Sequence, residues 1–208
     1  EGILIHTTDI GNFHSYILLD IVKRKIPIVL IGNPTKVAHI PNVFLDLEEG
    51  SYNLTRYLIY RGYKKFLYLS GSKKAETFLQ RINGHKKALS EAGILVKEED
   101  IIETIPEIEG GYETIFKIFS KKNILYDAVI CVNDYMALGA LKALKELGIS
   151  IPNQVGVAGY DDVIYSTLSD FPITTVKIPI QEIAQLSTNL LLNQIENKGG
   201  EREKLDYV

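Results

Sequence analysis

The chain is organised around residues 127–162, which read D-A-V-I-C-V-N-D-Y-M-A-L-G-A-L-K-A-L-K-E-L-G-I-S-I-P-N-Q-V-G-V-A-G-Y-D-D. Residues 128–132 form a short apolar run, which is typical of a strand buried on both faces of a parallel sheet. Asp134 is a good N-cap for the amphipathic helix that follows. A second apolar strand, residues 155–158, completes a strand–helix–strand unit.

Polar residues follow both strands of this unit. Asn133 comes directly after the first strand, and Asp161 comes after Gly159-Tyr160 at the end of the second. Ligands of open parallel sheets bind outside the carboxyl ends of the strands. We therefore expect the side chains of Asn133 and Asp161 to face a binding crevice.

The alternation of strand and helix patterns runs along the whole chain. The expected strands are residues 3–5, 26–31, 43–45, 65–69, 101–105, 128–132, 155–158 and 174–178. The expected helices are residues 17–22, 48–60, 77–92, 110–119, 135–147 and 181–197. This order predicts an α/β fold with parallel sheets. A seam in the pattern at Asp46 indicates two lobes, and we expect the ligand cleft between them.

The composition narrows the class of protein. The 208 residues are 46% hydrophobic and 24% charged, as in an ordinary soluble globular protein. A formal net charge of −3, with no block of Lys or Arg, gives no electrostatic footprint for nucleic acid. We therefore expect that these residues do not grip DNA themselves. No apolar run reaches about 18 residues, so we expect no transmembrane helix and no membrane partner.

The sequence holds no recognisable catalytic or metal-binding motif. The single cysteine, Cys131, lies inside an apolar run, which is typical of a small buried side chain and suits a reducing cytoplasm. The four histidines show no metal-ligand spacing. There is no P-loop, no G-x-G-x-x-G and no G-x-S-x-G. We therefore expect neither a cofactor nor a metal, and an α/β enzyme stays only as an alternative.

A buried-strand pattern begins at the first residue, G-I-L-I, with no leader before it. A parallel strand at that place needs a preceding neighbour and a crossover helix. We therefore expect the chain to be part of a longer protein.

Several phrases, in order along the chain, resemble the effector-binding core of the LacI/GalR family of transcription regulators. The phrases are I-P-I-V (26–29), Y-L-I-Y-R-G-Y-K-K-F (57–66), R-I-N-G-H (81–85), N-D-Y-M-A-L-G-A-L (133–141), I-P-N-Q-V-G-V-A-G-Y-D-D (151–162) and F-P-I-T-T-V (171–176). No single phrase is specific, but the ordered set is. The resemblance implies the periplasmic-binding-protein type I fold, with two Rossmann-like lobes joined by three crossovers.

The resemblance also implies how the chain divides. Residues 1–46 and 177–197 would form an incomplete N-terminal lobe, and residues 47–176 and 198–208 the C-terminal lobe. The family's helix-turn-helix headpiece, hinge helix and first strands of the N-terminal lobe have no counterpart here.

A set of ligand-binding residues follows from the resemblance. Arg81 matches an arginine that binds a hydroxyl pair or a carboxylate, which suits the planar fork of a guanidinium. Asp161 matches an acid that accepts hydrogen bonds from the ligand. The other implied contacts are polar residues at strand ends, on the Arg81 helix or at the crossover: Asn133, Thr77, His6, Thr7 and Asp46.

The resemblance implies the function of a cytoplasmic repressor that senses a small molecule, with a sugar or sugar phosphate as the expected effector. Ligand binding would control DNA binding allosterically, in a homodimer that contacts DNA through the absent headpiece. Two alternatives stay open. One is a sugar-binding protein of an uptake system with the same fold, and the other is the α/β enzyme.

Overall fold

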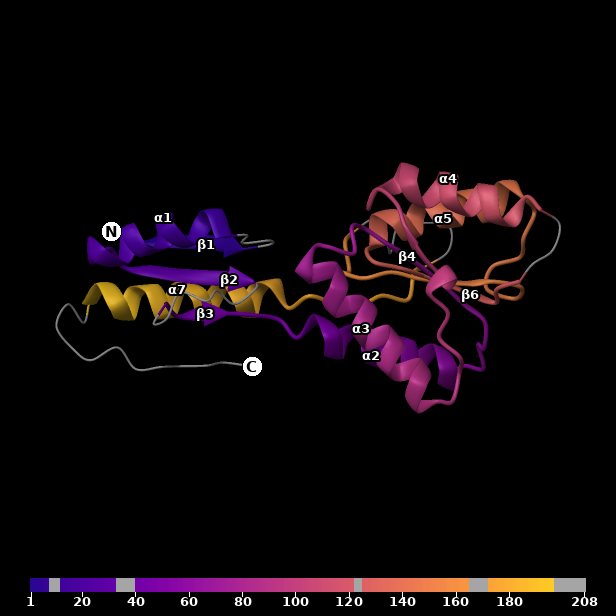
Figure 1. The fold of residues 1–208 in the computed structure, drawn as a ribbon, viewed down its shortest axis with the longest axis horizontal. Helices are drawn as coiled ribbons and strands as arrows, with labels where there is room; N and C mark the ends of the chain where they lie inside the picture. The colour runs from indigo at the N-terminus through magenta and orange to yellow at the C-terminus, as the bar shows by residue number, and fades with distance from the viewer. Residues whose placement is uncertain (8–11, 33–39, 122–124, 165–171, 197–208) are drawn as a thin grey trace. The chain divides into compact units, whose positions relative to one another are not determined.

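The computed structural model describes residues 1–7, 12–32, 40–121, 125–164 and 172–196. The chain forms two compact units (Figure 1). The first unit comprises Glu1–Asp46 and the C-terminal segment that begins at Pro179, and the second comprises Leu47–Ile178. The assignment of lobes, including residues 198–208 outside the described part, stays a prediction.

The first unit is a parallel sheet with a helix on each face. Its strands, in the order β1-β2-β3, are β1 (Ile3–Thr7), β2 (Ile28–Gly32) and β3 (Asn42–Val43). Its helices are α1 (Asn12–Lys23) and α7 (Ile180–Glu196). Because side chains alternate along a strand, Ile28 and Leu30 pack with Leu18 of α1, whereas Val29 packs with Leu190 of α7.

The second unit is a larger parallel sheet in the order β5-β4-β6-β7. Its strands are β4 (Phe66–Ser70), β5 (Ile101–Glu103), β6 (Ala128–Cys131) and β7 (Gly156–Ala158). Its helices are α2 (Leu47–Tyr60), α3 (Glu76–Glu91), α4 (Ile108–Phe119) and α5 (Asp134–Glu146), with a short 3₁₀ turn η1 (Glu98–Asp100) before β5. Helices α2 and α3 cover one face of the sheet, and α4 and α5 cover the other (Figure 1).

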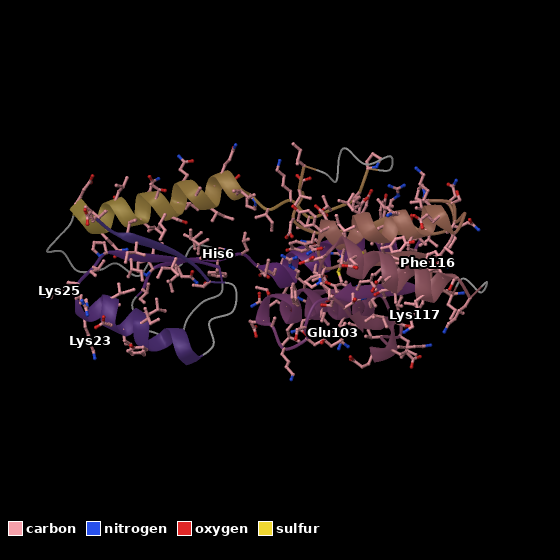
Figure 2. The ribbon with its side chains drawn as sticks, turned by 90° about the horizontal axis from the view of Figure 1, so that it is seen from above. His6, Lys23, Lys25, Glu103, Phe116 and Lys117 are labelled. Atoms are coloured by element: carbon pink, nitrogen blue, oxygen red, sulfur yellow. The ribbon has the colours of Figure 1, made fainter. Side chains whose placement is uncertain are left out.

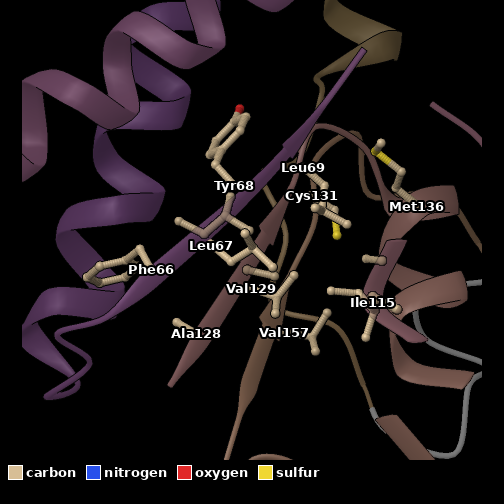
Figure 3. Packing of buried hydrophobic residues seen from close by; sticks show 14 of the residues in the cluster. Phe66, Leu67, Tyr68, Leu69, Ile115, Ala128, Val129, Cys131, Met136 and Val157 are labelled. Atoms are coloured by element: carbon tan, nitrogen blue, oxygen red, sulfur yellow. The ribbon is translucent and has the colours of Figure 1, made fainter. Parts of the chain in front are cut away.

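The apolar runs that predicted the central strands form the core of the second unit. Every residue of β4 and β6 is buried. Phe66 and Tyr68 point toward α2 and α3, and residues such as Ile115 and Met136 pack from the opposite side (Figure 3). Burial on both faces explains why these strands carry no alternating polar residues.

Each helix pair of the second unit packs through a glycine. A Cβ atom at Gly84 of α3 would lie 2.0 Å from the carbonyl oxygen of Glu48 in α2. A Cβ atom at Gly139 of α5 would lie 1.9 Å from the carbonyl oxygen of Ile108 in α4. The backbones therefore touch at these positions, and this close contact fixes where α3 and α5 lie on the sheet.

The predicted α/β class with parallel sheets is confirmed, and one predicted strand is wrong. Instead of a strand over residues 174–178, the structure has only isolated bridges, Ala158 with Thr174 and Asp161 with Lys177. The reason lies in the neighbouring segment that follows β7, where Asp161 and Asp162 adopt positive φ angles of 105° and 56°. This turn ends the extended conformation that a continuous ladder needs.

One polar ring lies inside the core of the second unit. His85 of α3 is 2% exposed, and its Nδ1 lies 3.0 Å from the hydroxyl of Thr55 in α2. Its ring centroid is 4.8 Å from that of Tyr68. Burial, with a smaller contribution from Lys86, lowers the pKa of His85 to about 3. The imidazole is therefore neutral in the folded protein at neutral pH.

The buried His85 predicts a loss of stability in mild acid. The unfolded chain takes up a proton at His85 near the ordinary pKa of about 6.5, whereas the folded protein does not, so the free energy of unfolding falls as the pH falls below that value. Between pH 7 and pH 5 we expect His85 to account for a loss of about 2 kcal/mol. Urea unfolding of the wild type and His85→Phe, followed by circular dichroism at both pH values, measures this difference. An equal loss in the two proteins would contradict it.

Candidate functional site

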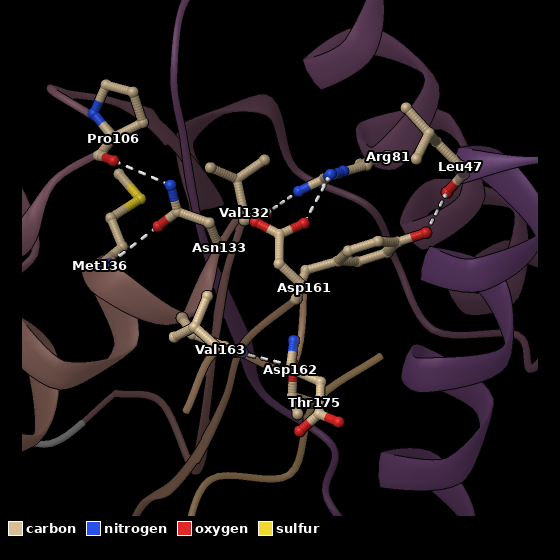
Figure 4. A network of polar contacts seen from close by, with 12 residues as sticks. Leu47, Arg81, Pro106, Val132, Asn133, Met136, Asp161, Asp162, Val163 and Thr175 are labelled. Atoms are coloured by element: carbon tan, nitrogen blue, oxygen red, sulfur yellow. Dashed lines mark hydrogen bonds and ion pairs between the residues drawn. The ribbon is translucent and has the colours of Figure 1, made fainter. Parts of the chain in front are cut away.

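Polar side chains gather at the carboxyl ends of β6 and β7 in the second unit. The two strand ends adjoin, because the backbone N–H of Asp134 donates to the carbonyl oxygen of Tyr160 at 2.9 Å. Helix α3 brings Arg81 to the same place (Figure 4). This is the edge where parallel sheets bind ligands.

The guanidinium of Arg81 is held by three groups from these strand ends. Its Nη2 donates to Oδ1 of Asp161 at 3.0 Å, and its Nη1 donates to the carbonyl oxygen of Val132 (Figure 4). The guanidinium carbon lies 3.9 Å from the centroid of the Tyr160 ring, which gives a cation–π contact. Arg81 and Asp161 therefore contact each other directly.

The two partners of this ion pair differ in exposure. The side chain of Arg81 is 11% exposed, whereas that of Asp161 is 33% exposed. Burial raises the pKa of Asp161, and the charge and hydrogen bond of Arg81 lower it. The Nε of Arg81 is buried and finds no hydrogen-bond partner among the described residues. Asp161 is thus the more accessible partner, and Arg81 binds its carboxylate from the buried side.

Tyr160 also belongs to this site, although it was not among the expected ligand contacts. Its ring is buried, and its hydroxyl donates to the carbonyl oxygen of Leu47 at 3.5 Å. A Cβ atom at Gly50 of α2 would lie 2.2 Å from the Tyr160 hydroxyl oxygen. A side chain at position 50 would therefore displace the Tyr160 ring, and glycine allows this ring to lie against the guanidinium of Arg81. The Gly-Tyr-Asp phrase was the only signal for it.

The turn that carries Asp161 is strained and is held by a buried acid. Positive φ angles at two successive residues other than glycine cost about 1–3 kcal/mol each. Asp134 has no exposed surface, and its carboxylate accepts from the N–H of Val163 at 2.8 Å and from the hydroxyl of Thr175 at 2.7 Å. Burial raises the pKa of Asp134, and these two hydrogen bonds oppose that rise.

The prediction that Asp134 caps helix α5 is wrong. Asn133 is the N-cap, with an extended backbone, and its Oδ1 accepts from the N–H of Met136 at 2.9 Å (Figure 4). Its Nδ2 donates to the carbonyl oxygen of Pro106 at 2.8 Å. Asn133 and Asp134 can each cap a helix, but the side chain of Asp134 is buried and hydrogen-bonded elsewhere, so it does not cap α5. Both the oxygen and the nitrogen of the Asn133 amide thus have protein partners. The ligand contact expected of Asn133 stays a prediction.

The remaining predicted contacts lie in both units. Thr77 is half-buried in the first turn of α3, one helical turn before Arg81. In the first unit, His6 is exposed on β1 (Figure 2), and buried Thr7 donates to the carbonyl oxygen of Ile31 at 3.1 Å. Asp46 is exposed at the end of the first unit's N-terminal segment. Their ligand contacts stay predictions.

Among the residues that the structure describes, no group of His, Cys, Asp or Glu side chains could hold a metal ion. The helices within the same ranges are too short or too polar to span a bilayer.

Comparison with known proteins agrees with this fold. The periplasmic binding protein-like domain family matches residues 55–206. The HTH-type transcriptional repressor PurR of Histophilus somni is 37% identical over 157 residues, which are 76% of this chain and 47% of that protein. The chain thus spans about half the length of this curated relative.

Solved structures of LacI-family regulators have the same fold. A sugar-binding transcriptional regulator of the LacI family from Escherichia coli, complexed with phosphate, is 27% identical with a TM-score of 0.80, and the match covers 97% of this chain and 72% of that one. A LacI-family regulator from Enterococcus faecium with bound ribose is 25% identical with a TM-score of 0.82, over 96% and 73% of the two chains. The predicted resemblance is confirmed: the chain belongs to the family of periplasmic binding protein-like domains, in the form found in LacI-family transcription regulators.

Proposed function

We propose that this chain is the effector-sensing part of a transcription regulator, most simply a repressor, and that its effector is a sugar or a similar hydroxylated metabolite. Similarity to a named repressor and to a sugar-binding LacI-family regulator supports the class of protein. The observation that carries the site is the Arg81–Asp161 ion pair at the carboxyl edge of the second sheet, with Asp161 as its accessible member.

Asp161 offers the effector an oriented acceptor. A carboxylate oxygen that is paired with a guanidinium on one side keeps lone pairs for hydroxyl donors on the other. Leaving such a partly buried group unpaired costs about 1–3 kcal/mol, so a ligand that supplies a hydroxyl gains specificity there. A sugar presents several hydroxyls with fixed geometry.

The charge of the pair favours a neutral ligand. Arg81 already has an anionic partner in Asp161, so the two groups together present no net charge to a ligand. An ionised carboxylate or phosphate group would compete with Asp161 for the guanidinium. We therefore propose a neutral sugar before a sugar phosphate.

Regulation follows from the difference in affinity between two states of the protein. An effector shifts such an equilibrium only as far as its affinities for the two states differ. We propose that this shift changes DNA binding by a headpiece outside the 208 residues, in a cytoplasmic homodimer. Two-fold symmetric regulators bind paired half-sites, so a change between subunits alters operator affinity.

The effector proposal predicts a specific loss on substitution of Asp161. Isothermal titration of the chain against neutral sugars, beginning with D-ribose, should find a binder. Asp161→Asn keeps the shape but removes the carboxylate, and we expect at least a tenfold rise in Kd, because a hydrogen bond to a charged group is worth about 1.5–3 kcal/mol.

Asp127→Asn is the matched control for this titration. Asp127 accepts hydrogen bonds from the N–H groups of Lys64 and Lys65, at the amino ends of β4 and β6, opposite to the proposed site. It loses the same charge, and we expect an unchanged Kd. Equal affinities for the wild type and Asp161→Asn would rule out Asp161 as the sugar contact.

The regulatory proposal predicts coupling between sugar and DNA. In the full-length protein, the sugar identified by titration should change the affinity for operator DNA by about 5- to 150-fold, the usual range of allosteric coupling. Fluorescence anisotropy with labelled DNA measures it. Sugar binding without any DNA binding by the full-length protein would contradict a regulator and favour a sugar-binding protein of an uptake system.

A further inference from the structure

Hydrogen bonds from outside fix the turn from Tyr160 to Val163. The backbone carbonyl of Tyr160 accepts from the N–H of Asp134 at 2.9 Å, and the N–H of Val163 donates to the Asp134 carboxylate at 2.8 Å. Asp134 therefore holds both ends of the turn that carries Asp161.

Thr175 holds the middle of the same turn. Its hydroxyl donates to Oδ1 of Asp134 at 2.7 Å and accepts from the N–H of Asp162 at 3.3 Å (Figure 4). One hydroxyl thus joins the buried carboxylate to the residue that follows Asp161. The positive φ angles of Asp161 and Asp162 lie inside this ring of hydrogen bonds, which explains how the strained turn persists.

We infer that Asp134 and Thr175 are positioning residues for Asp161: they hold its carboxylate against Arg81 and do not touch the ligand themselves. That Asp134 and Thr175 thereby contribute to effector binding rests on the proposed function. The geometric part, that the Arg81–Asp161 contact depends on Thr175 and Asp134, stands without any ligand.

The same contacts tie Asp161 to the segment that leads out of the second unit. The N–H of Asp161 donates to the carbonyl oxygen of Val176 at 2.9 Å, and Thr175 lies in the same segment. The second unit ends at Ile178. Asp161 is therefore hydrogen-bonded to the segment formed by residues 174–178.

The experiment measures how strongly Arg81 acts on Asp161, in ligand-free protein. Carbon-detected NMR of the full chain with labelled aspartate gives the pKa of Asp161, with its signal assigned through Asp161→Asn. In the wild type, Arg81→Met removes the neighbouring cation, and we expect the pKa of Asp161 to rise by about 1 or more. In a protein that already carries Thr175→Val or Asp134→Asn, we expect Arg81→Met to raise the pKa of Asp161 by less than half of the rise seen in the wild type.

Two further variants separate positioning from a general loss of stability. Thr175→Ser keeps the hydroxyl and should restore the full effect of Arg81→Met. Tyr126→Phe also removes a partly buried hydroxyl in the same unit, the partner of Asp100, and should leave the effect unchanged.

The outcomes are decisive in each case. An equal effect of Arg81→Met in the wild type, Thr175→Val and Asp134→Asn would overturn the inference, and so would no effect in the wild type. Since no ligand is used, a failure to find a binding sugar would count against the proposed function and leave this result standing.

Discussion

The ion pair between Arg81 and Asp161 is the contact on which the site depends. It joins helix α3 to the end of β7, two segments that are 80 residues apart in the chain. Tyr160 lies against the guanidinium, and Val132 accepts one of its N–H groups. Because Arg81 is the more buried partner, its main effect is to orient the carboxylate of Asp161. The acceptor for a ligand is therefore built before any ligand arrives, which lowers the cost of binding.

The core of the second unit keeps this pair in place. Buried strands β4 and β6 fix the edge at which the side chains meet, and close contacts at Gly84 and Gly139 fix the helices on either face. Arg81 lies only one turn of α3 before His85, which is packed against Tyr68. The position of the guanidinium thus follows from the packing of the helix that carries it.

Much of this could be predicted from the sequence, because apolar runs and helical periodicity report burial directly. Residues 128–132 and 155–158 indicated two strands, and the ends of those strands led to Asp161. The sequence could not show that Asn133, and not Asp134, caps α5, since both residues can cap a helix and only the fold decides which side chain enters the core. Nor could it show that the strand at 174–178 is missing, because the positive φ angles that interrupt the strand arise from hydrogen bonds to Asp134 and Thr175.

A crystal structure of this chain with its bound sugar would show whether Asp161 binds the effector. We expect a sugar hydroxyl within hydrogen-bond distance of the Asp161 carboxylate, with Arg81 still paired to the same carboxylate. A sugar bound away from Asp161, or a sugar that contacts Asp161 only after the Arg81 pair has broken, would contradict this expectation.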